Sequence, residues 1–270
     1  MFKTLYNEAI LEFNMETKGP LFIQSGEENP LNPTAADNSY LALYKDGKLV
    51  PVIPGTSMKG VFRSRSEKLL GANFYVCNIL NIKESCGHKM LRHNKDLSGK
   101  ERYKKSCAAC KLFGSVALKS RIEFDDCYPI DECVIGKRTL VSIDRIKGSA
   151  KENALYDFEY VEYGKFKCRI RLKNFFNWHI KLLMKIFQDI NDGFVTFGGL
   201  TSKGFGRMEV EDLKLKIRYY SNVDNKAYIN KGFYREREVE GIKNINYLFK
   251  DVTIDENSIQ GCELSHEQVL

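Results

Sequence analysis

Apolar and polar residues alternate with a period of two in three segments of the chain, 8–16, 121–124 and 166–172. This pattern is typical of β-strands that bury one face and expose the other. Residues 208–217 continue in the same extended style, and the apolar run 194–197 predicts a further short strand. The chain therefore contains the strands of a half-buried sheet.

Two other segments repeat their apolar residues at helical spacing. We predict one helix from an N-cap at Thr56 to Gly71, and another over 182–190 with Gly193 in the C′ position. Their apolar stripes consist of Met58, Val61, Phe62 and Leu69, and of Leu182, Leu183, Ile186, Phe187 and Ile190. Both helices have one face suited to packing against the sheet.

The resulting order is strand, helix, strand, strand, helix, strand. It predicts an α+β protein with a ferredoxin-like (RRM-like) βαββαβ core. We expect this palm to span residues 1–217, with a long polar loop at 19–39, a cysteine- and lysine-rich insertion at 72–119 and a hairpin-like excursion at 136–164. Residues 218–270 are expected to form a C-terminal extension with an acidic tail.

Composition narrows the class of protein. With 270 residues and 43% hydrophobic content, the chain can bury a substantial core, and its net charge of +7 favours polyanionic partners mildly. Basic residues concentrate in 83–111 and acidic ones in 251–270. The chain has neither a long apolar run nor a signal-like N-terminus, so we expect a cytoplasmic protein with no membrane partner.

Four of the eight cysteines fall within one insertion. Two form a Cys-x-x-Cys pair, and four thiolates suit a closed tetrahedral zinc site. A redox pair is the alternative, but the thioredoxin-like setting for it is missing. His88 or His93 could also replace Cys77 or Cys86 as ligands. The expected ligands of a structural Zn²⁺ are Cys77, Cys86, Cys107 and Cys110.

Residues 197–207 form a glycine-rich loop around two cations, Lys203 and Arg207. Glycines such as Gly199 and Gly204 allow backbone N–H groups to approach phosphates closely. The spacing fits neither a Walker A loop nor a dinucleotide-binding fingerprint, which disfavours a mononucleotide cofactor. A simple glycine-rich strand turn is the structural alternative.

A second candidate phosphate site lies at the start of the first helix. A helix N-terminus offers free N–H groups and partial positive charge, and Ser57, Lys59 and Arg63 lie nearby. Capping alone explains a serine here. It does not explain Gly60, which weakens a helix interior unless something approaches closely.

Together, the motifs Ile53–Gly60, Leu112–Ser115, Ile143–Arg145 and Gly198–Gly206 resemble the RAMP (repeat-associated mysterious protein) superfamily. More specifically, they resemble the backbone subunits of type III CRISPR effector complexes. Departures from their pattern, such as Met58 in the first motif and the large cysteine insertion, indicate a zinc-bearing subgroup.

The resemblance implies a palm that binds the CRISPR guide RNA by its backbone and stacks with neighbouring copies or paralogues in a filament. It also implies a thumb hairpin at 136–164, bearing Arg145, that wedges into the duplex of guide and target RNA. Sequence would then be read by base pairing and not by the protein. Guide RNA, target RNA and other subunits of the complex are the expected partners.

The resemblance further implies an endoribonuclease that cleaves target RNA through an aspartate in the loop after the first strand. Asp37 occupies that place, and Asp46 is the alternative. An aspartate can hold Mg²⁺ against the scissile phosphate or help deprotonate the ribose 2′-OH. Two other hypotheses remain open: a stand-alone RAMP endoribonuclease that processes CRISPR RNA, and a non-catalytic zinc-containing RNA-binding assembly protein.

Overall fold

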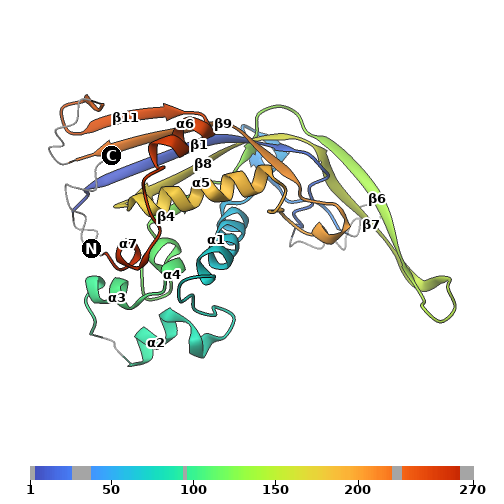
Figure 1. Ribbon diagram of the computed structural model, residues 1–270. Coiled ribbons are helices and arrows are strands. Elements are labelled where there is room, and N and C mark those ends of the chain that lie inside the picture. Colours follow the sequence, from blue (N-terminus) through green and yellow to red (C-terminus); the bar gives the residue numbers. More distant parts are fainter. Residues whose placement is uncertain (1–3, 26–37, 94–95, 221–226, 262–270) are drawn as a thin grey trace.

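The computed structural model describes residues 4–25, 38–93, 96–220 and 227–261. Its centre is a seven-stranded sheet with antiparallel pairing throughout (Figure 1). The strands are β1 (Asn7–Thr17), β4 (Ile122–Phe124), β5 (Tyr128–Pro129), β8 (Lys165–Lys173), β9 (Met208–Tyr219), β10 (Ile229–Asn230) and β11 (Arg235–Glu240). Their spatial order is β10-β11-β9-β1-β8-β4, and β5 also pairs with β8.

Two helices, α1 (Gly55–Gly71) and α5 (Asn177–Asn191), lie against one face of this sheet (Figure 1). Phe13 of β1 packs against Phe187 of α5 with ring centroids 4.9 Å apart, and Phe187 packs against Phe62 of α1 at 5.5 Å. The period-two face of the strand and the helical stripes therefore meet in one aromatic cluster. Its burial fixes both helices on the sheet.

The other face of the sheet carries columns of charge that alternate in sign from strand to strand. Acidic side chains on β1 and β11 oppose basic ones on β8 and β9, as the antiparallel register requires. The resulting cross-strand ion pairs are Glu12–Arg169 (2.6 Å), Glu236–Arg218 (2.7 Å), Glu238–Lys216 (3.2 Å) and Glu240–Lys214 (2.6 Å).

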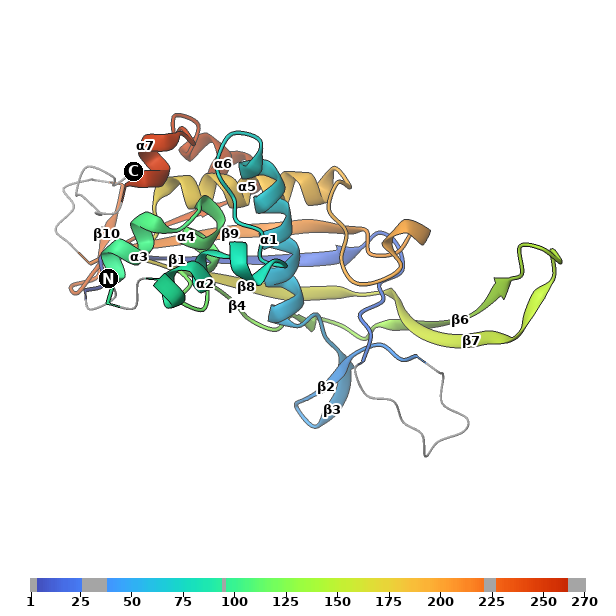
Figure 2. The ribbon, with the colours of Figure 1, turned by 90° about the horizontal axis from the view of Figure 1, so that it is seen from below.

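Two hairpins leave the sheet. The first, β2 (Ala42–Lys45) and β3 (Lys48–Pro51), turns at Asp46-Gly47, both with positive φ, which matches a tight hairpin turn. The second, β6 (Val134–Ile143) and β7 (Ala150–Tyr163), projects far beyond the body of the molecule (Figure 2). The base of this long hairpin contacts the core through residues such as Val161.

The cysteine-rich segment folds beside α1 as four short helices: η1 (Ile82–Glu84), α2 (Cys86–His93), α3 (Gly99–Lys105) and α4 (Ala108–Phe113). After the sheet, α6 (Ile242–Leu248) and α7 (Glu256–Gln260) bury Ile245 and Ile259 in the main core. Lys111 of α4 donates to the Ile259 carbonyl over 2.9 Å, which ties α7 to the cysteine-rich segment.

The structure confirms a mixed α/β protein with antiparallel strands and corrects two local predictions. Thr56 is not the N-cap of α1: the helix begins at Gly55, whose N–H donates to Asp126 Oδ1 over 2.8 Å, and Pro54 takes the N-cap place. Residues 194–197 are not a strand. They form only an isolated bridge between Thr196 and Arg207, and the run is not uniformly buried, since Phe194 is 69% exposed. None of the described helices is both long and apolar enough to span a membrane.

Candidate functional site

The four cysteines of the insertion converge on one point. Their sulfur atoms all lie within 4.8 Å of one another, and all four side chains are buried. Cys77 precedes η1, Cys86 opens α2, and Cys107 and Cys110 belong to the N-terminus of α4. Sulfurs around a tetrahedral zinc lie about 3.8 Å apart, given Zn–S bonds of about 2.3 Å. The group can therefore hold a metal ion such as Zn²⁺.

Hydrogen bonds between the thiols indicate how this group responds to charge. Hydrogen bonds with the side chains of Cys110 and Cys86 lower the pKa of Cys107, which favours the thiolate form of this cysteine over those of its neighbours. The side-chain hydrogen bond with Cys107 raises the pKa of both Cys86 and Cys110, because further negative charge is disfavoured beside the first thiolate. A bound dication would reverse that preference and let every ligand ionise.

The alternative histidine ligands have different outcomes. His88 lies on α2 but does not belong to the group of four, and its buried Nε2 has no hydrogen-bond partner. The side chain of His93 lies outside the described residues. Within the part of the chain that is described, the cluster consists of cysteines alone.

The glycine-rich loop contains η2 (Thr201–Lys203) and is fastened to the segment that follows β1. Gly199 N–H donates to the Phe22 carbonyl over 2.7 Å, and Gly206 N–H donates to the Pro20 carbonyl over 2.8 Å. Several of its glycines thus serve close backbone packing. The side chains of Lys203 and Arg207 remain exposed, and a Cβ on Gly204 would meet nothing within 4 Å.

An aromatic cluster joins this loop to the base of the long hairpin. Phe205 packs against Tyr160 at 5.3 Å and against Phe158 at 5.7 Å between ring centroids. Arg138 lies over both Tyr160 and Phe205, and its Nε donates to Tyr160 Oη over 2.9 Å. This junction is not predictable from local periodicity, and its one signal in the sequence is the interleaving of arginine and aromatic residues in 136–164. The cluster packs the base of the hairpin against the glycine-rich loop.

The candidate residues at the start of α1 have different surroundings. Ser57 and Lys59 are partly exposed, whereas Arg63 turns toward the cysteine cluster and hydrogen-bonds to Cys110 Sγ. Burial and the nearby charge of Arg63 lower the pKa of Lys59. Gly60 is exposed and opens into a groove of about 260 Å³ whose other wall contains Phe194 and Thr196.

Arg145 lies at the tip of the long hairpin, apart from the glycine loop and α1 (Figure 2). The tip is a defined turn, because Asp144 Oδ1 accepts the N–H groups of Ile146 (2.8 Å) and Lys147 (3.1 Å). These backbone hydrogen bonds lower the pKa of Asp144. The turn presents Arg145, Lys147 and an almost fully exposed Ile146 (97%) to the surroundings.

Asp37, the catalytic candidate, lies outside the described residues. Among the described residues, the carboxylates of Glu16, Glu209 and Glu211 lie close enough together to hold a cation. Lys18 bridges the first two at 3.1 and 2.9 Å, and Lys165 pairs with Glu211 at 2.6 Å. Lysines already neutralise this group, so we do not assign Mg²⁺ to it.

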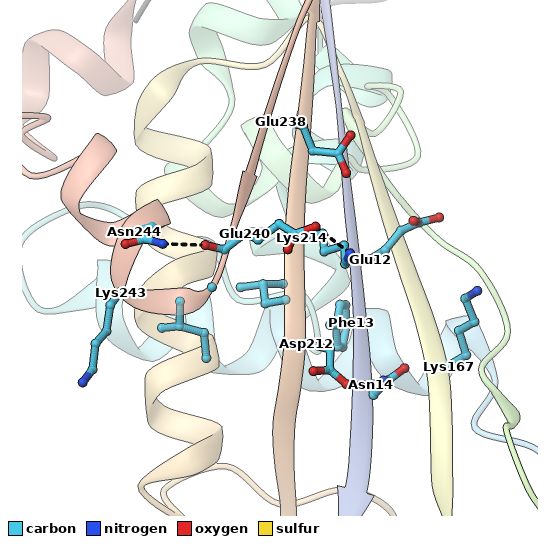
Figure 3. Close-up of a pocket in the computed structure, with 13 residues that line it drawn as sticks. Glu12, Phe13, Asn14, Lys167, Asp212, Lys214, Glu238, Glu240, Lys243 and Asn244 are labelled. Atoms are coloured by element: carbon cyan, nitrogen blue, oxygen red, sulfur yellow. Dashed lines mark hydrogen bonds and ion pairs between the residues drawn. The ribbon is translucent and has the colours of Figure 1, made fainter.

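A groove of about 1090 Å³ crosses the charged face of the sheet at the point where β11 gives way to α6 (Figure 3). Its walls include Glu12, Asp212, Lys214 and Glu240. Lys214 is paired with Glu240, and Asp212 Oδ2 accepts a hydrogen bond from Asn14 over 2.8 Å. The mixed and largely paired charges do not suit a polyanion.

A comparison with known protein families shows to which family the chain belongs. The sequence model of the RAMP superfamily matches residues 14–209, which include β1, α1, the cysteine-rich segment, the long hairpin and the glycine loop. The chain belongs to the RAMP superfamily. No curated protein matches it in sequence.

Membership in the RAMP superfamily supports a CRISPR-associated role in which the chain binds RNA beside other subunits. The matched residues include the glycine loop with Lys203 and Arg207, the start of α1 and the long hairpin. The structure brings the first two of these close together, since Thr196 in the wall of the α1 groove pairs with Arg207. It holds the hairpin tip with Arg145 at a distance (Figure 2).

Proposed function

We propose that this RAMP protein is a guide-RNA-binding backbone subunit of a type III CRISPR ribonucleoprotein. Its palm would be a ferredoxin-like domain over 1–217, and residues 218–270 an extension of it. The order β9-β1-β8-β4, with α1 and α5 on one face, supports this assignment because it is the arrangement of a βαββαβ core. The four cysteines would hold a structural Zn²⁺.

The observation that carries the proposal is a continuous surface from α1 to the glycine loop. It begins at Ser57, follows the groove beside Gly60 one helical turn later, and reaches Arg207 through Thr196. Cations beside open glycine positions suit a ribose-phosphate backbone. We assign to this path the residues Ser57, Gly199, Lys203, Gly204 and Arg207, whereas Lys59 lies near Arg63 and Glu123 on the other side of α1.

The charged face of the sheet supports the same path by contrast. An RRM uses the open face of its sheet to stack bases. Here cross-strand ion pairs occupy that face, as in Glu12–Arg169 and Glu236–Arg218. We infer that RNA follows the helix and glycine-loop side and does not cross the sheet.

The long hairpin would act as the thumb of the subunit. Arg145 and Lys147 can contact phosphates, and Ile146 presents an apolar tip to a nucleic-acid duplex. The aromatic cluster of Phe158, Tyr160 and Phe205 would hold the thumb at a fixed angle to the guide-binding path.

The path is tested by replacing Lys203 and Arg207 together with glutamine and measuring guide-RNA binding by fluorescence anisotropy, with companion subunits present, over a range of salt concentrations. Affinity should fall, and the salt slope should decrease by about one per lost phosphate contact. The matched control replaces Lys214 and Lys216 of the sheet face with glutamine. Equal losses in the two double variants would contradict the path.

We further propose that Asp37 cleaves target RNA in the assembled complex, with Mg²⁺ as the cation. This half of the proposal rests on the position of Asp37 in the sequence. Asp37→Ala should abolish cleavage of a labelled target and leave its binding intact, and Asp46→Ala should cleave normally. Retained cleavage in Asp37→Ala refutes the catalytic half, and processing of repeat RNA by the isolated chain would favour the stand-alone enzyme instead.

A further inference from the structure

Arg63 extends from α1 into the cysteine cluster. Its Nη2 donates to Cys110 Sγ over 3.3 Å, its Nη1 donates to the Gly114 carbonyl over 3.1 Å, and its Nε donates to Glu67 Oε1 over 2.8 Å. The side chain is only 16% exposed. A guanidinium engaged in three directions has little capacity left for a phosphate.

The cluster needs positive charge when a metal is bound. Four thiolates outweigh one dication, so a loaded site is a buried anion, which is costly without compensation. Backbone N–H groups give partial compensation: that of Cys107 donates to Cys86 Sγ over 3.3 Å, and that of Cys110 donates to Cys107 Sγ over 3.5 Å. Arg63 adds a full charge at Cys110.

The second contact of Arg63 reinforces the first. Gly114 is the C-cap of α4, with φ 79°, and a Cβ there would lie 2.7 Å from Ser120 N. This crowding and the positive φ together require glycine at this position. Arg63 therefore contacts the short helix α4 at a metal ligand and at its C-terminus, where helix carbonyls attract cations.

We propose that Arg63 is a positioning residue of the metal centre. Its guanidinium neutralises the thiolates from the side of α1 and couples the position of α1 to metal loading. The inference is independent of RNA binding. It needs only the four-cysteine site and the contacts of one arginine.

Three variants of the full chain test this role: Arg63→Met, which removes the charge, Arg63→Lys, which keeps it, and Lys68→Met, which removes an exposed charge from the same helix. Loss of a group that hydrogen-bonds to a ligand typically weakens metal binding about 10- to 100-fold. Zn²⁺ transfer to a chromogenic chelator should show this loss of affinity in Arg63→Met and a smaller loss in Arg63→Lys. Lys68→Met should keep the wild-type affinity. The thiolate-to-metal absorption of the Co²⁺-loaded protein should also shift in Arg63→Met alone.

Wild-type affinity and an unshifted Co²⁺ spectrum in Arg63→Met would overturn the proposal. Hydrogen exchange of the wild-type protein provides a test that needs no variant to fold. Removal of Zn²⁺ should accelerate exchange around Ser64 and Glu67 of α1 and leave the middle of α5 unchanged. If α1 exchanges equally with and without metal, the coupling is refuted, whatever the outcome of the RNA experiments.

Discussion

Two positions of the glycine-rich loop, 204 and 206, differ in how strictly the fold requires glycine there. Gly204 and Gly206 both have positive φ, 86° and 83°. A Cβ on Gly206 would lie 2.1 Å from the Phe197 carbonyl oxygen, whereas one on Gly204 would meet nothing within 4 Å. Backbone conformation alone constrains Gly204, while conformation and packing both constrain Gly206.

Alanine at these positions separates the two costs. Gly204→Ala should destabilise the fold by about 1–2 kcal/mol, the cost of a left-handed alanine. Gly206→Ala should cost roughly 1–3 kcal/mol more because of the clash. Urea unfolding of both variants measures the difference. Equal destabilisation of the two variants would show that the Phe197 carbonyl moves aside at little cost in free energy.

The long hairpin is the element whose removal best separates folding from binding. Replacing residues 141–155 by Asn-Gly would join Leu140 to Tyr156, which are paired across the two strands. This truncation keeps Arg138, Phe158 and Tyr160, and the removed residues whose side chains are described, 141–151, are exposed apart from the partly buried Asp144.

The free energy of unfolding of the truncated protein should lie within about 0.5 kcal/mol of the wild-type value, as expected for changes confined to the surface. Its affinity for guide RNA alone should hardly change, while retention of the guide–target duplex in the assembled complex should weaken. Thermal unfolding and anisotropy with single- and double-stranded RNA check both halves. Unaltered duplex retention would argue against a thumb.

Elements with a strong local pattern were predictable from the sequence. The period of two predicted β1, β8 and β9. Helical spacing predicted α5, and Gly193 predicted where this helix ends. The convergence of the four cysteines on one point was predictable because metal ligands cluster in sequence as well as in space. The short helices α2, α3 and α4 were not, because the packing around the cysteines forms them more than their own periodicity does.

Contacts between distant segments were beyond the sequence. Nothing near Arg63 shows that it contacts Cys110, 47 residues later, or that Asp126 receives the first N–H of α1. The apolar run 194–197 has strand-like composition, yet tertiary context leaves it as a connection with Phe194 exposed. The placement of Asp37 stays a prediction.

The whole molecule should lose stability in mild acid because of one buried histidine. His179 of α5 is fully buried, and its Nδ1 accepts the Phe176 N–H over 3.1 Å. Burial, helped by the charge of Arg121, lowers its pKa well below 6.5. Below about pH 6.5 the unfolded chain therefore binds a proton that the folded chain does not, and the stability conferred by neutral His179 is lost as the pH falls.

The expected slope from this group approaches about 1.4 kcal/mol per pH unit below pH 6.5. Urea unfolding between pH 7.5 and 5.5 should show it in the wild type and show a shallower slope in His179→Asn, which keeps a hydrogen-bond acceptor. Comparing slopes cancels the packing cost of the substitution. Parallel slopes in the two proteins would contradict the assignment.

The alternating charge columns of the sheet also affect how the assembled protein would respond to ionic strength. Arg169, Lys216 and Arg218 each have a carboxylate partner within the sheet, so few mobile anions gather over them. RNA that passes elsewhere displaces no ions from this wall. On the RNA path proposed above, the entropic gain of association would come from the α1 surface, the glycine loop and the long hairpin, and a small salt exponent would be its thermodynamic signature.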